Sequence, residues 1–163
     1  MILVLCGTQK QDFSRMVKCV VETATTEEIV VQGGHNTYEI DRVRNVNFVS
    51  PLQLEELYNE ATLVVTHAGA GSMIAALEHQ KKVIAFPRLK KYSEHVNNHQ
   101  VELARKFESL GYLLMYHEEV ESFQDVYERM KSFEPLSYVR QQEMVTMIDN
   151  RITALLTNKK SSR

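Results

Sequence analysis

Residues 62-TLVVTHAGAGSMIAALEHQKKVIAFP-87, followed at position 94 by EHVNNHQ, decide the fold expected for this chain. An apolar run ends in a His-Ala-Gly-Ala-Gly-Ser turn, which opens a helical segment, and a second apolar run follows. This order predicts a strand, a helix and a parallel second strand. Because the first N–H groups of a helix are unpaired and lie at the positive end of its dipole, the turn suits a phosphate group.

The rest of the chain repeats this alternation of apolar runs and helical spacing. Further strands are predicted at residues 1–5, 28–31, 46–49 and 112–116, in addition to 63–66 and 83–86 of the opening stretch. Helices are predicted at residues 12–24, 72–80, 96–110 and 119–132, and another starts at Pro51 and turns Leu52, Leu54, Leu57 and Tyr58 inward. Strands that alternate with helices indicate an α/β fold, a Rossmann-like three-layer arrangement around one parallel sheet.

Ligands of such sheets bind at the carboxyl ends of the strands. The pairs Gly7-Thr8 and Gly33-Gly34, residues 67–72 and the segment from Pro87 onward all follow predicted strands. We therefore expect these segments to meet at one edge of the sheet.

The chain is expected to divide into three regions. Residues 1–133 form the Rossmann-like domain. Residues 134–157 form a C-terminal amphipathic helix, starting at about Leu136, whose apolar stripe packs either on its own domain or on a partner. Residues 158–163 form a disordered tail.

The composition is that of a globular protein, with 44% hydrophobic and 25% charged residues. A net charge of −2 gives no chain-wide footprint for nucleic acid, so no nucleic-acid partner is predicted. Cys6 and Cys19 lack metal-ligand spacing and are interpreted as reduced, which fits a cytosolic protein. We predict neither a signal peptide nor a transmembrane segment, because no apolar run is long enough.

The glycine-rich turn holds the first candidate site. Gly69 and Gly71 allow close approach of the backbone to a ligand and special backbone angles. Ser72 can cap the helix and donate to a phosphate oxygen, and His67 can donate to a diphosphate. A tight turn that binds no ligand is the alternative. The dinucleotide pattern GxGxxG is incomplete, since Ile74 stands where its third glycine would be.

Two polar clusters follow. Residues 94–100 combine one acid, two histidines and three amides, the donors and acceptors that sugar hydroxyls need, although they also suit a simple capped helix start. His95 and His99 have i,i+4 spacing but no intervening Glu, so no metal is predicted. Five cations lie nearby and would attract a diphosphate, an anionic lipid or an acidic partner, or would only form a solvated rim: Lys81, Lys82, Arg88, Lys90 and Lys91.

Together these motifs resemble the donor-binding C-terminal half of GT-B glycosyltransferases of family 28. The resemblance rests on VVTHAGAGS, VIAFP and EHVNNHQVELA, extends to GTQKQDFSRMV and FVSPLQLEELYNEA, and covers roughly residues 1–116. In length and motifs the chain is similar to the soluble catalytic subunits of split transferases. Some of these act in bacterial exopolysaccharide or capsule synthesis, and others add N-acetylglucosamine to dolichol diphosphate.

The resemblance implies a role for each part of the site. The donor diphosphate is assigned to Gly7, Thr8, His67, Gly69, Ala70, Gly71 and Ser72. The uracil and ribose are assigned to Phe48, Val49 and Glu78, and the sugar to Glu94, His95, Asn98, His99 and Gln100. Many relatives have an acidic ribose ligand three positions after the serine. That position is Ala75 here, so either Glu78 replaces this ligand or the contact is lost.

The resemblance also implies a reaction. The chain would be the subunit of an inverting glycosyltransferase that moves a hexose, of the galactose or N-acetylglucosamine type, from a UDP-sugar to a lipid-diphosphate-linked saccharide in polysaccharide biosynthesis. A membrane-anchored partner subunit would supply the acceptor half and hold the chain at the inner, cytoplasmic face of the membrane. No cofactor and no metal are expected, since no DxD motif is present, and the catalytic base is unassigned. The alternative is a non-catalytic regulatory subunit that binds a nucleotide sugar.

Overall fold

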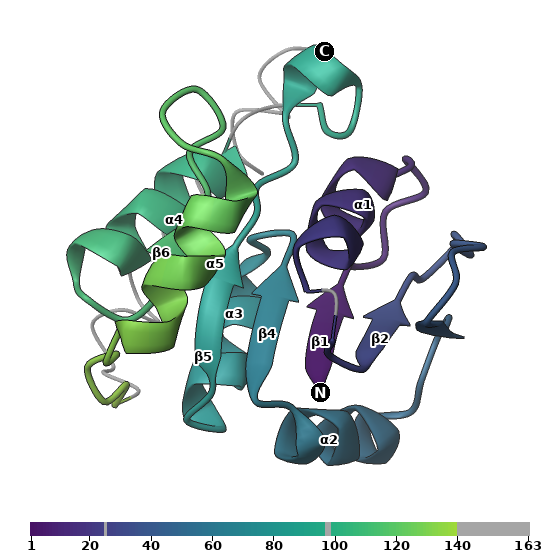
Figure 1. Cartoon of the computed structure of the whole chain (residues 1–163), viewed down its shortest axis with the longest axis horizontal. Helices are drawn as coiled ribbons and strands as arrows, with labels where there is room; N and C mark the ends of the chain where they lie inside the picture. The colour runs from purple at the N-terminus through teal and green to yellow at the C-terminus, as the bar shows by residue number, and fades with distance from the viewer. Residues whose placement is uncertain (25, 97–98, 140–163) are drawn as a thin grey trace, which may run out of the picture.

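The computed structural model describes residues 1–24, 26–96 and 99–139 and contains a six-stranded parallel sheet between helices (Figure 1). The strands are β1 (Ile2–Leu5), β2 (Ile29–Gln32), β3 (Val43–Val46), β4 (Leu63–Thr66), β5 (Lys82–Ala85) and β6 (Leu114–Met115). The helices are α1 (Ser14–Thr23), α2 (Pro51–Glu60), α3 (Ala70–Glu78), α4 (His99–Ser109) and α5 (Phe123–Ser132), with a 3-10 turn, η1, at Lys90–Tyr92.

The strand order is β3-β2-β1-β4-β5-β6, which confirms the predicted α/β class. The chain builds outward from β1 to β3, returns to place β4 beside β1, and then builds outward in the other direction. β1 and β4 pair along their whole length, with Leu5 opposite Thr66. The loops that follow these two strands therefore leave the sheet side by side at the point where the strand order reverses.

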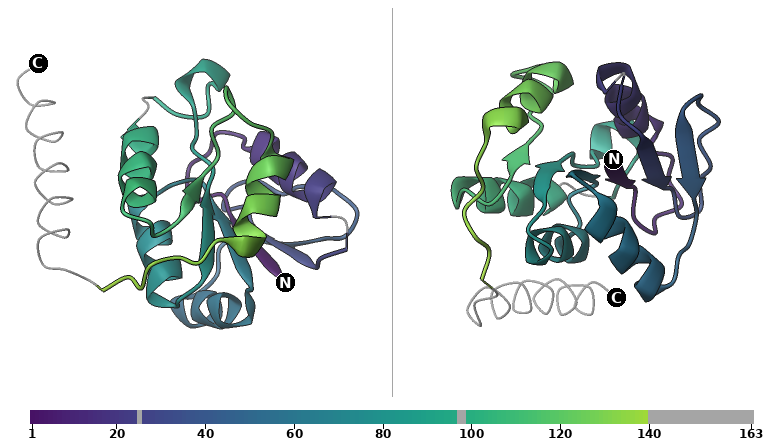
Figure 2. Two further views of the ribbon diagram at one scale, coloured as in Figure 1. Left: turned by 60° about the vertical axis from the view of Figure 1, so that its left-hand side comes forward. Right: turned by 60° about the horizontal axis from the view of Figure 1, so that its bottom comes forward.

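Two hydrophobic layers hold the helices on the sheet. Alternate β1 residues enter opposite layers: Ile2 and Val4 join the cluster of α1 and α5, whereas Leu3 and Leu5 join that of α2, α3 and α4. Figure 2 (right) shows α1 and α5 on one side of the sheet and α2 and α3 on the other. Burial on both faces explains why the strands are apolar throughout.

Two details of the sequence prediction for residues 46–60 are wrong. β3 covers residues 43–46 instead of 46–49, because Asn47 accepts hydrogen bonds from Gln32 and Gly34 and already belongs to the turn after the strand. α2 begins at Pro51 as predicted, with a capping box between Ser50 and Gln53. Leu52, however, is 66% exposed, so the prediction that it faces inward is wrong.

The described end of the chain is irregular. Residues 133–139 contain no helix, so the predicted start of the C-terminal helix at Leu136 is wrong. The Leu136 N–H instead bonds the carbonyl of Gly111, and the Tyr138 ring stacks on Phe107. Residues 140–157 of the predicted helix and the predicted tail at 158–163 lie outside the described residues.

Both cysteines are free, as predicted, and burial raises the pKa of the Cys6 thiol to about 11. Within the described ranges, no helix combines the length and the apolar character that crossing a bilayer requires.

Candidate functional site

The loops after β1, β2 and β4 meet at the carboxyl edge of the sheet, as expected. A Cβ atom on Gly34 would lie 2.4 Å from the carbonyl oxygen of Gly7, and a Cβ on Gly7 would lie 2.7 Å from His67 Nε2. Gly7 also has φ +80°, which favours glycine. The three loops therefore touch at positions where a larger residue would not fit. Since ligands of open α/β sheets bind where the strand order reverses, the crevice between β1 and β4 is the candidate site.

His67 lies at the centre of this crevice. Its Nδ1 is 3.0 Å from the Leu5 carbonyl oxygen, which can only accept, so Nδ1 carries the proton of this hydrogen bond. Burial lowers the pKa of His67 to about 4, and the ring is neutral at pH 7. Nε2 then presents a lone pair between Gly7 and Gly69. Donation from Nε2 to a phosphate, the role expected for His67, therefore requires the ring to take up a proton.

The turn after β4 differs in detail from the sequence prediction. α3 begins at Ala70 instead of Ser72, and Gly69 is its N-cap residue, without a capping side chain. Ser72 is thus the third residue of the helix, and its predicted capping role is wrong. The first intrahelical bond runs from the Met73 N–H to the Gly69 carbonyl at 3.0 Å. The N–H groups of Ala70, Gly71 and Ser72 precede it and face the end of the helix, where an anion would find them.

The glycines of this turn provide space and do not supply the special backbone angles predicted for them. The left-handed residue is Ala68, with φ 62°, whereas Gly69 has φ −71°. A Cβ on Gly69 would lie 2.3 Å from His67 Nε2, so glycine is needed there for the ring. A Cβ on Gly71 would meet no described atom within 4 Å, which leaves open space above the first turn of α3.

Some side chains of the proposed sugar-binding segment, residues 94–100, bind other parts of the protein. Glu94 is only 4% exposed, and its carboxylate accepts two bonds from Arg15, at 2.9 and 2.7 Å, and one from the Leu89 N–H. Gln100 Oε1 accepts from the Arg88 N–H at 3.2 Å, so its NH2 group is the part that would meet a ligand. His95 and His99 are half-buried at this edge, and Asn98 lies outside the described residues.

The proposed base and ribose contacts lie on two other elements. Phe48 is 59% exposed after β3 and packs edge-to-face on His35, with ring centroids 4.9 Å apart, and Val49 follows it. Glu78 is exposed at the last residue of α3. It lies about 9 Å along the helix axis from Ser72, twice as far as Ala75. The assignment of Glu78 to the ribose stays a prediction.

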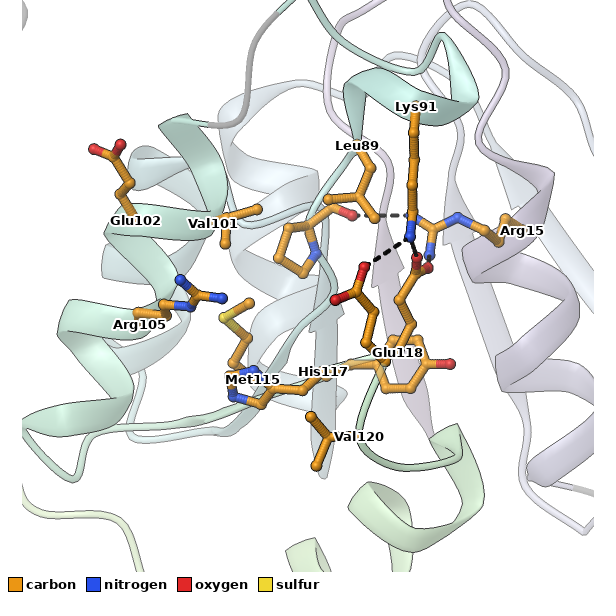
Figure 3. Close-up of a pocket in the computed structure, with 13 residues that line it drawn as sticks. Arg15, Leu89, Lys91, Val101, Glu102, Arg105, Met115, His117, Glu118 and Val120 are labelled. Carbon is orange, nitrogen blue, oxygen red and sulfur yellow. Dashed lines mark hydrogen bonds and ion pairs between the residues drawn. The ribbon is translucent and has the colours of Figure 1, made fainter.

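The sequence did not indicate a cavity of about 400 Å³ at the carboxyl ends of β5 and β6 (Figure 3). Val101 and Arg105 of α4 form one wall, and the Arg15 guanidinium, bonded to Glu118 at 2.8 Å, lies at the opposite wall. Lys91 forms an ion pair with the same carboxylate. This cavity adjoins the Glu94 segment and not the β1–β4 crevice. In the described part of the chain, no three His, Cys, Asp or Glu side chains gather as metal ligands.

The structural roles of two arginines could not be predicted from the sequence. Arg15 has no motif, since its partners Glu94 and Glu118 lie 79 and 103 positions away. Arg88 was interpreted as part of a nucleotide-attracting or solvated rim, but its side chain is 0% exposed. Its position directly after Pro87, at the carboxyl end of a strand, was the sequence feature that could have indicated a role at the site.

Comparisons with known proteins show the family of this chain. Residues 1–160 match the family model for the glycosyltransferase family 28 C-terminal domain. A UDP-N-acetylglucosamine transferase subunit ALG13 from Eremothecium gossypii is 41% identical over 69 residues, which are 42% of this chain and 32% of that protein. The human UDP-N-acetylglucosamine transferase subunit ALG13 is 28% identical over 125 residues, and the match covers 69% of this chain and 10% of that protein. The chain thus spans about a third or less of the length of these curated relatives.

Solved structures show the same fold. The solution structure of an ALG13 has a TM-score of 0.58 and 18% identity, and the match covers 90% of this chain and 93% of that one. MurG from Acinetobacter baumannii has a TM-score of 0.56 and 13% identity, and the match covers 79% of this chain and 41% of that one. At these identities the likeness concerns the fold alone.

Proposed function

This chain belongs to the glycosyltransferase family 28 C-terminal domain family, and from this premise we propose that it is the donor-binding subunit of an inverting hexosyltransferase. The donor would be a UDP-sugar of the galactose or N-acetylglucosamine type, and the acceptor a lipid-diphosphate-linked saccharide in polysaccharide biosynthesis. One observation carries the proposal. The uncapped start of α3, His67 and the Gly7 loop adjoin one another where the strand order reverses.

In the proposed reaction, different groups of the site have different roles. When an acceptor hydroxyl attacks the anomeric carbon, the bond to UDP breaks and negative charge grows on the diphosphate. The N–H groups of Ala70, Gly71 and Ser72, which lie at the positive end of α3, would stabilise that charge. A protonated His67 would add a donor from the side of β1. The residue that removes the acceptor proton stays unassigned: the partner subunit is one source, and His95 and His99 are the candidates in this chain.

The proposed partner carries the acceptor half and the membrane anchor. Two observations support it: the curated relatives are named subunits, and the described residues form a single Rossmann-like domain. The chain would then work at the inner, cytoplasmic face of the membrane through that partner.

Transfer of radiolabelled hexose from a UDP-sugar to a lipid-diphosphate acceptor, by the chain co-expressed with its membrane partner, tests the proposal. Replacing Ser72 with alanine is expected to raise the KM for the donor about tenfold, because a hydrogen bond to a charged phosphate is lost. Ser109→Ala, at the far end of α4 where the hydroxyl bonds the Lys106 carbonyl, is the matched control and should leave KM unchanged.

A nucleotide-sugar-binding regulatory subunit is the second candidate. It is the better description if the complex binds UDP but transfers no hexose from any UDP-sugar. An unchanged KM in the Ser72 variant would show that this hydroxyl does not bind the phosphate. The transfer assay would still distinguish a transferase from a regulatory subunit.

A further inference from the structure

Arg88 is an unusual charged residue, because its side chain is completely buried and its acceptors among the described residues are main-chain carbonyls and not carboxylates. Nη2 donates to the Cys6 carbonyl at 2.9 Å, and Nη1 donates to the carbonyls of Gln11 at 3.0 Å and Glu94 at 3.3 Å. The guanidinium lies 4.3 Å above the centre of the Phe13 ring. Its buried Nε has no hydrogen-bond partner among the described residues.

This arrangement is unfavourable for stability alone. Burying an ion costs several kcal/mol even after relaxation of the protein, and an apolar side chain of similar volume is often equally stable or better. Burial accordingly lowers the pKa of Arg88. The hydrogen bonds to main-chain carbonyls offset only part of this cost, since Nε has no partner in the described part of the chain. The contacts of the guanidinium, and not its burial, are therefore the reason to retain an arginine.

The carbonyls that Arg88 binds belong to the two proposed donor-binding segments. Cys6 and Gln11 flank residues 7–10, the loop that contains Gly7 and Thr8, so one planar group holds both ends of that loop. On the other side the guanidinium holds the carbonyl of Glu94. The main-chain N–H of the same residue donates to Gln100 Oε1, which extends the link to the start of α4.

We propose that Arg88 is a positioning residue for the nucleotide-sugar donor: it fixes the loop at residues 7–10 relative to Glu94 and Gln100, at the separation that the diphosphate and the sugar require. This inference rests on the proposed function only for the identity of the ligand. The fixing of the loop itself is a property of the ligand-free chain and can be measured without UDP.

Arg88→Lys separates geometry from charge. Lysine keeps the positive charge but replaces the planar fork by a single flexible ammonium group, which does not hold three carbonyls in one plane. Arg105→Lys is the matched control. Arg105 is exposed and lies on the opposite wall of the cavity from Arg15 (Figure 3), and among the described residues it forms no hydrogen bond or ion pair with either donor segment.

Backbone ¹⁵N relaxation gives the direct readout. In the native chain without ligand, the order parameters of Thr8, Gln9 and Lys10 are expected to be about 0.85, as in rigid backbone, although these residues are exposed. In Arg88→Lys they should fall below about 0.6, and the dissociation constant for UDP should rise about tenfold because the loop is no longer preorganised. The control variant should match the native chain in both measurements.

The possible outcomes separate the two claims. Low order parameters in the native loop refute the positioning role without any variant, even if Arg88→Lys does not fold. An Arg88→Lys chain with a rigid loop and native UDP affinity refutes it as well, whereas a rigid native loop that loosens in this variant supports it. Failure of the native chain to bind UDP, together with a loop that loosens in Arg88→Lys, would overturn the proposed ligand and leave the positioning role intact.

Discussion

Glu94→Ala is expected to lower the free energy of unfolding by about 3 kcal/mol, since removing one partner of a buried ion pair leaves the other charge uncompensated. The Glu94 side chain is 5% exposed and bonds Arg15 at 2.9 and 2.7 Å, and Arg15 is itself only 21% exposed. Arg15 keeps Glu118 as a partner, which places the loss at the lower end of the range for such pairs. Urea denaturation followed by circular dichroism measures it.

Glu119→Ala is the matched control, because Glu119 pairs with Lys91 at 3.2 Å from an exposed position of the same region. Its effect should stay within about 0.5 kcal/mol, as for other surface charges. Equal stabilities of the Glu94 and Glu119 variants would show that the buried pair contributes nothing. A normal stability of Glu94→Ala combined with lost donor binding would instead restore the sugar-binding role expected from the sequence.

Acidification is expected to lower the stability of the folded chain because of His67. In the unfolded chain this imidazole binds a proton at its ordinary pKa of 6.5, but in the folded chain only near 4. Between these values the unfolded state binds more protons, so stability falls as the pH drops through 6.5 toward 4, by about 3 kcal/mol for this one group. Urea denaturation at pH 7 and pH 4.5 should show most of this loss in the native chain.

His67→Gln removes the titrating ring. The free energy of unfolding of this variant should therefore depend less on pH than that of the native chain. Saturating UDP should reduce the loss in the native chain, because a diphosphate beside Nε2 favours the protonated ring. The same pH dependence in both proteins would contradict a buried neutral His67.

Local sequence patterns predicted most of the fold because the deciding features are short-range. The apolar run at residues 63–66 forms β4 as predicted, and the glycine-rich turn after it leads into a helix. The errors have equally local causes. Ser72 is a favourable capping residue, but Gly69 occupies the N-cap position, where the adjacent His67 ring leaves no room for a Cβ atom. The run at 46–49 is mostly apolar, yet only Val46 belongs to β3, and the other three residues lie between the strand and α2.

The contacts that hold the site together could not be predicted from local patterns, since they join residues far apart in the sequence. Nothing in EHVNNHQ indicates that Glu94 binds an arginine 79 positions earlier. Likewise Arg88, close to Lys90 and Lys91 in the sequence, has the pattern of an exposed rim. Only the folded chain shows that the carbonyl of Cys6, 82 positions away, is its partner. Polar residues that bind a ligand and polar residues that hold the site together look the same in a sequence.

The central claim is that the crevice between β1 and β4 holds the UDP part of the donor. A titration of the ¹⁵N-labelled chain with UDP, followed through backbone amide signals, tests it directly, because each binding segment reports separately. We expect the largest shifts at Gly7, Thr8 and residues 70–72, saturating with a single dissociation constant. Shifts confined to Arg105 and residues 115–120 around the large cavity, or no shifts at millimolar UDP, would contradict the account.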